Sequence, residues 1–203
     1  MAGPTAAGEQ KAWELLAALR PEDVIRTARV TFDAASACYT IRSFGMDFSI
    51  SQNERTIISR DPKSHILLDQ QGDFFRVAVL WYLVNAKEMN TTGRLVKPQD
   101  ISGGDIFTKG SHILPLEKVA QTYGNDKAGF LDWGRALGGE VLTIADASLR
   151  IYPLPRIPMT MTLWFADDEF PARADLLLDS TAELQAPTDI LWSLAMMSVL
   201  IML

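Results

Sequence analysis

The chain has 203 residues, of which 48% are hydrophobic and 22% charged, a composition typical of a soluble globular protein with one substantial core. Its 19 basic and 25 acidic residues give a formal net charge of −6, and no run is rich in Lys or Arg, which argues against nucleic acid as a partner. The single cysteine, Cys38, excludes an intrachain disulfide and, with no signal peptide, favours the cytoplasm.

The first part of the chain predicts two helices followed by short strands. Residues 1–10 are small and polar and predict a disordered tail, so we expect a single domain over residues 11–203. A helix is expected over residues 10–19, and Pro21 begins a second one. From residue 37 the apolar period changes to two, which predicts strands over 37–41, 46–50 and 56–59, with Gly45 at a bulge or tight bend.

The middle of the chain predicts three helices and a glycine-rich connection. Apolar residues at helical spacing predict a helix over residues 73–87 with Asp73 as its N-cap, and shorter helices over 116–123 and 127–137. The connection over 94–112 matches no phosphate-binding loop, but long irregular connections are often functional. Gly103, Gly104 and His112 are therefore candidate ligand-binding residues, although for His112 we favour the alternative of a structural hydrogen bond to the backbone.

The stretch 146–179 predicts three successive strands and is the centre of the expected fold. Apolar residues alternate over 147–152, 157–165 and 170–179, as in half-buried strands. Proline has no N–H to donate, so Pro153, Pro155 and Pro158 predict a stiff, extended connection between the first two strands. Residues 166–169 are short and polar, which predicts a hairpin loop.

The acidic turn formed by Asp167, Asp168 and Glu169 is the second candidate site, together with the neighbouring Trp164. Adjacent carboxylates are the ligands that Mg²⁺ and Ca²⁺ prefer, so this turn is a candidate metal site. The alternative, which we favour, is a solvated hairpin tip that discourages edge-to-edge pairing. The pattern leaves open whether Asp146 and Asp179 approach the same turn.

The chain ends in an uncharged run over residues 190–203. The run is shorter than the roughly 20 residues of a membrane-spanning helix, which favours a buried helix over a membrane anchor. Thr188 or Asp189 is the expected N-cap. The predicted fold is therefore α+β, a single domain with antiparallel strands in two sequence regions, flanking helices and a buried apolar C-terminal helix.

Several segments in order resemble the domain-of-unknown-function 3786 family, which consists of uncharacterised bacterial and archaeal proteins, mostly from anaerobes. The segments are FFRVAVLWYLVNA, TTGRLVKPQDISGGDIF, GSHILPLEKVAQTYG and the whole of 146–179, with WFADDEFP as the most specific part. Some similar proteins carry an additional N-terminal four-cysteine iron–sulfur module, which this one-cysteine chain lacks. By association, the resemblance implies an accessory role in anaerobic redox or corrinoid metabolism.

Two functions follow as hypotheses. The first is an accessory or binding protein that holds an unidentified small molecule or protein partner, helped by aromatic residues that otherwise belong to the core: Trp81, Tyr82, Trp133 and Trp164. The second is a metal-dependent enzyme that uses Asp167, Asp168 and Glu169, with a carboxylate whose pKa burial raises. A structural homo-oligomer that buries the C-terminal helix is a further alternative. No cofactor follows from the sequence.

Overall fold

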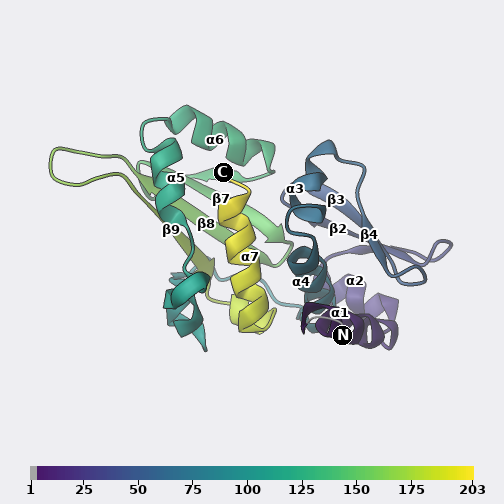
Figure 1. Ribbon diagram of the computed structural model, residues 1–203. Coiled ribbons are helices and arrows are strands. Elements are labelled where there is room, and N and C mark those ends of the chain that lie inside the picture. Colours follow the sequence, from purple (N-terminus) through teal and green to yellow (C-terminus); the bar gives the residue numbers. More distant parts are fainter. Residues whose placement is uncertain (1–3) are drawn as a thin grey trace.

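The structure, a computed structural model, describes residues 4–203 and holds two antiparallel sheets with helices around and between them (Figure 1). The first sheet has the strand order β1-β2-β3-β4 and the second the order β5-β9-β8-β7-β6. Each sheet belongs to one half of the chain, and one continuous cluster of buried apolar residues runs through both halves. The predicted α+β class, with antiparallel strands in two sequence regions, is confirmed.

The N-terminal half contains the four-stranded sheet and the helices beside it. Its elements are α1 (Pro4–Ala17), α2 (Pro21–Ala28), β1 (Thr31–Asp33), β2 (Cys38–Ser43), β3 (Met46–Ser51), β4 (Thr56–Ile58), η1 (Pro62–Ser64), α3 (His65–Leu68) and α4 (Gly72–Asn85). The expected tail over residues 1–10 is wrong from residue 4 onward, because α1 already begins at Pro4. Residues 1–3 lie outside the described part of the chain.

The C-terminal half contains the five-stranded sheet. Its elements are β5 (Leu95–Val96), η2 (Pro98–Asp100), η3 (Gly104–Thr108), η4 (Gly110–His112), α5 (Leu116–Tyr123), α6 (Lys127–Ala136), β6 (Glu140–Leu142), β7 (Ala147–Leu154), β8 (Ile157–Trp164), β9 (Arg173–Asp179), η5 (Ala182–Leu184) and α7 (Thr188–Leu200). The predicted glycine-rich connection is therefore not irregular throughout, because it holds β5 and three short 3₁₀ helices.

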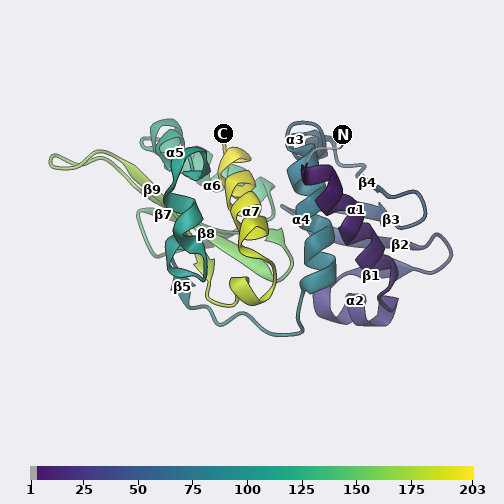
Figure 2. The ribbon, with the colours of Figure 1, turned by 60° about the horizontal axis from the view of Figure 1, so that its bottom comes forward.

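Helices cover one face of the five-stranded sheet (Figure 2). Gly134 of α6 lies directly against Leu149 of β7, and Ser198 of α7 donates a hydrogen bond to the sulfur of Met159 on β8. Met159, Met161 and Leu163 point to this covered face and are fully buried, as the period of two predicts. Helix α4 packs against α7 and so joins the two halves.

The prolines do not form the predicted extended connection, because β7 runs on through Pro153 and β8 includes Pro158. Neither Pro153 nor Pro158 lies at a position where the strand ladder needs a backbone N–H. The β7–β8 register shifts between Ile151 and Leu154, so Pro153 lies in a bulge, and the pairing of β8 with β9 starts only at Met159. Only two residues, at positions 155 and 156, connect the strands.

Helix α7 is buried on most sides, as predicted from its uncharged sequence. Pro187, rather than Thr188 or Asp189, is its N-cap, and the Thr188 hydroxyl donates instead to the carbonyl of Ser102 at 2.8 Å. Within residues 4–203, no helix combines the length and the apolar character needed to cross a bilayer.

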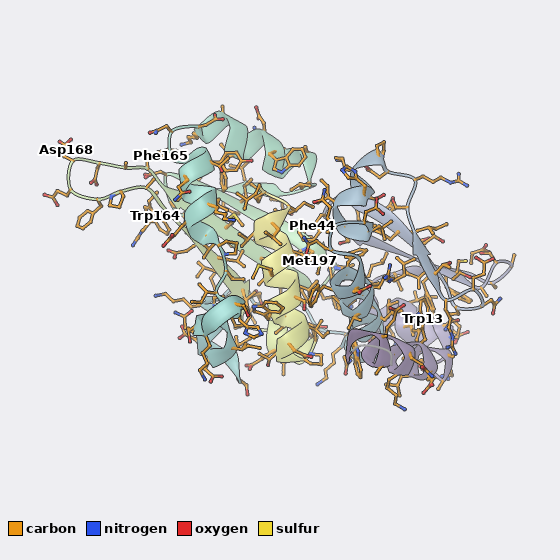
Figure 3. The ribbon with its side chains drawn as sticks, viewed as in Figure 1. Trp13, Phe44, Trp164, Phe165, Asp168 and Met197 are labelled. Atoms are coloured by element: carbon orange, nitrogen blue, oxygen red, sulfur yellow. The ribbon has the colours of Figure 1, made fainter. Side chains whose placement is uncertain are left out.

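The tip of the first sheet docks on the second half of the chain. Phe44 and Gly45 form the tight turn between β2 and β3, both at positive φ. A Cβ on Gly45 would lie 2.9 Å from the backbone nitrogen of Gly138, so the turn approaches the end of α6 more closely than any other residue would allow. The Ser43 hydroxyl donates to the carbonyl of Pro153 at 2.7 Å. Figure 3 shows Phe44 between the two halves.

Candidate functional site

The predicted site residues lie in two separate places. Gly103, Gly104 and His112 lie in the connection beside the start of α7. Trp164 ends β8, and the acidic turn lies on the connection from β8 to β9, at the end of the second sheet that points away from the first sheet (Figure 1). The structure therefore does not bring the glycine-rich segment and the acidic turn together.

His112 lies in a hollow of about 440 Å³ between the two halves, which we call the aromatic groove. Phe74, Val77 and Trp81 line it from one face of α4, because their spacing of three and four positions places them one above another. The remaining lining comes from α1, η3, η4 and α7 and consists of Gly8, Ile106, His112, Pro187, Asp189, Ile190, Trp192 and Ser193.

Trp192 organises the aromatic groove. Its indole N–H donates to the backbone carbonyl of His112 at 2.8 Å, and the two rings meet edge to face with centroids 4.8 Å apart. Phe74 meets the same indole edge to face at 6.1 Å, and 48% of Phe74 is exposed. The His112 carbonyl thus accepts the hydrogen bond from Trp192, while its ring lines the groove and makes no hydrogen bond to the backbone of another described residue.

Several polar groups in the groove are left for a ligand. Within the described residues, the indole N–H groups of Trp13, Trp133 and Trp192 each have a protein acceptor, whereas that of Trp81 has none. The groove thus combines apolar aromatic walls with a free N–H donor, and the Asp189 side chain lies at its rim.

Gly103 and Gly104 are explained by packing. Gly103 has φ +71°, a conformation that favours glycine, and lies against Thr188 at the start of α7. A side chain on Gly104 would collide with the carbonyl of Pro98. Both residues shape the turn that leads to the aromatic groove, but neither lines it.

The predicted four-residue hairpin turn is in fact an eight-residue loop over residues 165–172, which we call the acidic loop. Strand β9 begins only at Arg173, so Phe170, predicted as an inward-facing strand residue, lies on the loop and is 66% exposed. Figure 3 shows Asp168 at the outer end of the loop, away from Trp164 and Phe165 at its base.

The carboxylates of the acidic loop do not gather into a cluster of metal ligands. Among residues 4–203, no three His, Cys, Asp or Glu side chains are placed to hold a metal ion. Asp167 instead accepts hydrogen bonds from the backbone N–H groups of Glu169 and Phe170, at 2.9 and 2.7 Å. These bonds lower the pKa of Asp167, the opposite of the shift that a general base at neutral pH requires.

The base of the acidic loop borders a second hollow, of about 640 Å³. Asp146 lies there and accepts a hydrogen bond from the N–H of Phe165 at 2.9 Å, while the guanidinium of Arg173 lies 4.3 Å from the ring centroid of Trp164. The remaining lining consists of Asp167, Phe170 and Pro171.

Asp179 lies at the other end of β9 and does not approach the acidic loop. Its carboxylate accepts hydrogen bonds from Thr92, Gly93 and Thr181, which join the start of β5 to the end of β9. Burial alone would raise the pKa of Asp179, but these hydrogen bonds outweigh burial and lower it. The residue is therefore a structural anchor.

Sequence reasoning missed the most informative groove residues, Phe74 and Trp192. Phe74 has the spacing of a core residue on α4, and Trp192 lies within an uncharged run that predicts burial on all sides, so local pattern alone marks both as core. Of the other aromatics suggested for a pocket, Tyr82 is fully buried and the Trp133 indole donates to the carbonyl of Ile201.

Comparisons with known proteins point to one family. A search of curated proteins and a search of solved structures each found no significant match. A family model described as "Domain of unknown function (DUF3786)" matches residues 20–200, which is most of the chain, and the resemblance drawn from the sequence is thereby confirmed. The chain belongs to this family of unknown function.

Proposed function

We propose that the protein is an accessory binding protein whose aromatic groove holds a flat, largely apolar ligand. The observation that carries the proposal is the meeting of Phe74, Trp81 and Trp192, from two different helices, around one hollow. Aromatic walls with few polar groups are typical of small-molecule sites, and a volume of about 440 Å³ falls within their usual range.

The polar groups of the groove restrict the ligand further. The unpartnered N–H of Trp81 suits an acceptor on the ligand, and Asp189 at the rim suits a donor or a positive charge. The single cysteine supports a reducing, cytoplasmic setting. Corrinoids and haems each contain a flat macrocycle, so they are suitable first probes, and a bound corrinoid would support the accessory role in anaerobic redox or corrinoid metabolism that the family resemblance implies.

The test is a titration of the purified protein with a corrinoid and with haem, followed by ligand absorbance and tryptophan fluorescence. We expect saturable quenching, because two tryptophans, Trp81 and Trp192, line the hollow. Phe74→Ala should weaken binding by roughly tenfold, since an aromatic contact contributes up to about 1.5 kcal/mol beyond its area. The matched control is Phe170→Ala, which removes another exposed aromatic ring outside the groove.

Absence of any saturable signal with both probes would remove the tetrapyrrole-like form of the proposal. If Phe74→Ala and Phe170→Ala weaken ligand binding equally, the ligand does not occupy the aromatic groove. Either result would return the search to protein partners.

A further inference from the structure

Strand β9 has an edge that is only partly used. On that side β5 pairs with just two residues, Leu178 and Asp179. Residues 173–177 pair with β8 on the other side, but within the described chain no strand continues the row of β5 beside them. Because alternate residues of a strand present N–H and C=O to each edge, backbone donors and acceptors stay open over roughly 17 Å.

Strand β5 ends after two residues because of the sequence that follows it. After Val96 the chain reaches Pro98, which cannot donate to a ladder, and turns away into η2. The five residues of β9 beyond this point keep a regular strand conformation and pairing with β8. The place beside them has the geometry of an added strand.

Two hollows follow the open edge. The larger, of about 590 Å³, lies between α5 and residues 171–174, and a second of about 170 Å³ continues it along residues 175–177. Consecutive strand residues point to opposite faces, so hollows lined by such runs lie along the edge and not on one face. Leu116 lines both hollows, so they lie next to each other. Figure 2 shows α5 beside β9.

The wall of the larger hollow beside α5 is built from small residues. Gly124, which caps the C-terminal end of α5, lies so close to the residue before β9 that an added Cβ would stand 2.7 Å from the Cβ of Ala172, and Ala120 and Ala174 complete this wall. A segment paired with β9 would direct every second side chain into this hollow, where an apolar group fits.

The charges along the edge are mostly negative. Glu117 and Asp175 line the two hollows, and the acidic loop at the end of the strand adds Asp167, Asp168 and Glu169. Only Lys97 and Arg173 oppose these five carboxylates. None of the five takes part in an ion pair with another described residue.

We propose that the open edge of β9 is a docking site for an extended segment of a partner protein, which adds as an antiparallel strand in the row of β5. Main-chain hydrogen bonds to β9 would supply affinity, and alternate side chains would supply specificity. The segment would alternate apolar residues, which face α5, with Lys or Arg, which face Asp175 and the acidic loop.

The first test uses a blocked heptapeptide in which valine alternates with lysine, titrated by calorimetry at low salt. In one version every valine nitrogen is methylated, and in the other every lysine nitrogen. Because N–H groups on one edge of a strand come from alternate residues, one methylated version should bind at least tenfold more weakly while the other binds like the parent. Absent binding of the parent peptide, or equal effects of both methylations, would overturn the proposal.

The second test changes the protein. Gln121 is exposed and lines the larger hollow, so Gln121→Trp should fill the hollow and weaken the parent peptide at least tenfold. Thr122→Trp is the matched control, because Thr122 is also exposed on α5 but does not line the hollow. Equal binding by both variants would overturn the proposal.

A second copy of this chain is the competing occupant. We expect sedimentation of the unliganded protein to show no dimer formed through this edge, that is, no dimer that dissociates when Asp175→Lys is introduced. Such a dimer would overturn the proposal, because the edge would then already be occupied in solution.

Discussion

Two buried tyrosines differ in how their hydroxyl groups are satisfied. The Tyr82 hydroxyl donates to the carbonyl of Ala28 at 2.9 Å and accepts from the N–H of Arg156 at 3.2 Å. The Tyr39 hydroxyl is equally buried but has no hydrogen-bond partner among the described residues. Burial raises the pKa of both phenols, so both stay neutral at physiological pH.

The two tyrosines predict opposite effects of the same substitution. Tyr82→Phe should lower the free energy of unfolding by about 1–3 kcal/mol, because it leaves two buried backbone groups unpaired. Tyr39→Phe should leave it unchanged or raise it by about 1 kcal/mol, because it removes only an unsatisfied hydroxyl. Urea denaturation of the two variants measures both values, and a loss above about 1 kcal/mol for Tyr39→Phe would show that its hydroxyl has a partner.

Single residues could be placed from sequence only where a local pattern constrains them. Asp126 directly precedes a run of helical spacing, a position where aspartate is a preferred N-cap, and its carboxylate accepts from the N–H of Gly129 at 2.8 Å. Asp179 had the spacing of an ordinary strand residue, and its five hydrogen-bond donors come from residues up to 87 positions away or from the turn that follows it. The physical cause of its burial is therefore absent from the local sequence.

At the scale of elements, the end of α2 depends on a residue from the other half of the chain. The last carbonyls of a helix have no partner within it. Here the guanidinium of Arg156, in the turn between β7 and β8, donates to the carbonyls of Arg26 and Thr27, and also to that of Met89. Arg156 is 5% exposed, and its positive charge also interacts favourably with the negative, C-terminal end of the α2 helix dipole.

Arg156→Met should lower the free energy of unfolding by about 3 kcal/mol or more, because three carbonyls lose a charged donor. Arg156→Lys should recover only part of the loss, since one ammonium group cannot reach as many acceptors as a planar guanidinium. The control is Arg42→Met, which breaks the exposed pair with Asp47 and should cost less than about 1 kcal/mol. Thermal unfolding of the three variants ranks them, and a cost for Arg156→Met as small as that of the control would contradict this role.

Element types were predictable where the period of apolar residues was strong, as in β8 and α4. The strand ends near proline were not, because proline is excluded only where a ladder needs its N–H. At Pro158 the neighbouring strand pairs from the next residue onward, and at Pro153 a bulge absorbs the gap. The length of the acidic loop was also missed, since Phe170 continues the alternating pattern although no partner strand reaches it.

At the scale of the whole molecule, the two halves meet through a contact that only glycine allows. Gly45 has φ +75°, and a Cβ there would lie 2.8 Å from the carbonyl carbon of Leu137. Gly138, on the opposite side, has φ +71° and would carry its own Cβ to 2.8 Å from the Cα of Gly45. Direct contact between the two backbones therefore fixes the position of one half against the other.

Gly45→Ala should lower the free energy of unfolding by about 2–4 kcal/mol, from backbone strain and from overpacking against α6. Gly93→Ala separates the two causes, because Gly93 has nearly the same φ, +73°, with open space where its Cβ would lie. It should cost only the strain, about 1–2 kcal/mol. Chemical denaturation gives both values, and equal losses would mean that the close approach to α6 contributes nothing.

The cap of α2 by Arg156 has a consequence for biosynthesis. The two positions it joins lie up to 130 residues apart in the chain. A ribosome that adds 5–20 residues per second makes α2 roughly 6–26 s before the arginine that completes it. The end of α2 in the nascent N-terminal half therefore stays open until residue 156 has been translated. The surface of α4 that receives α7 stays exposed for longer, until residues 188–200 have followed.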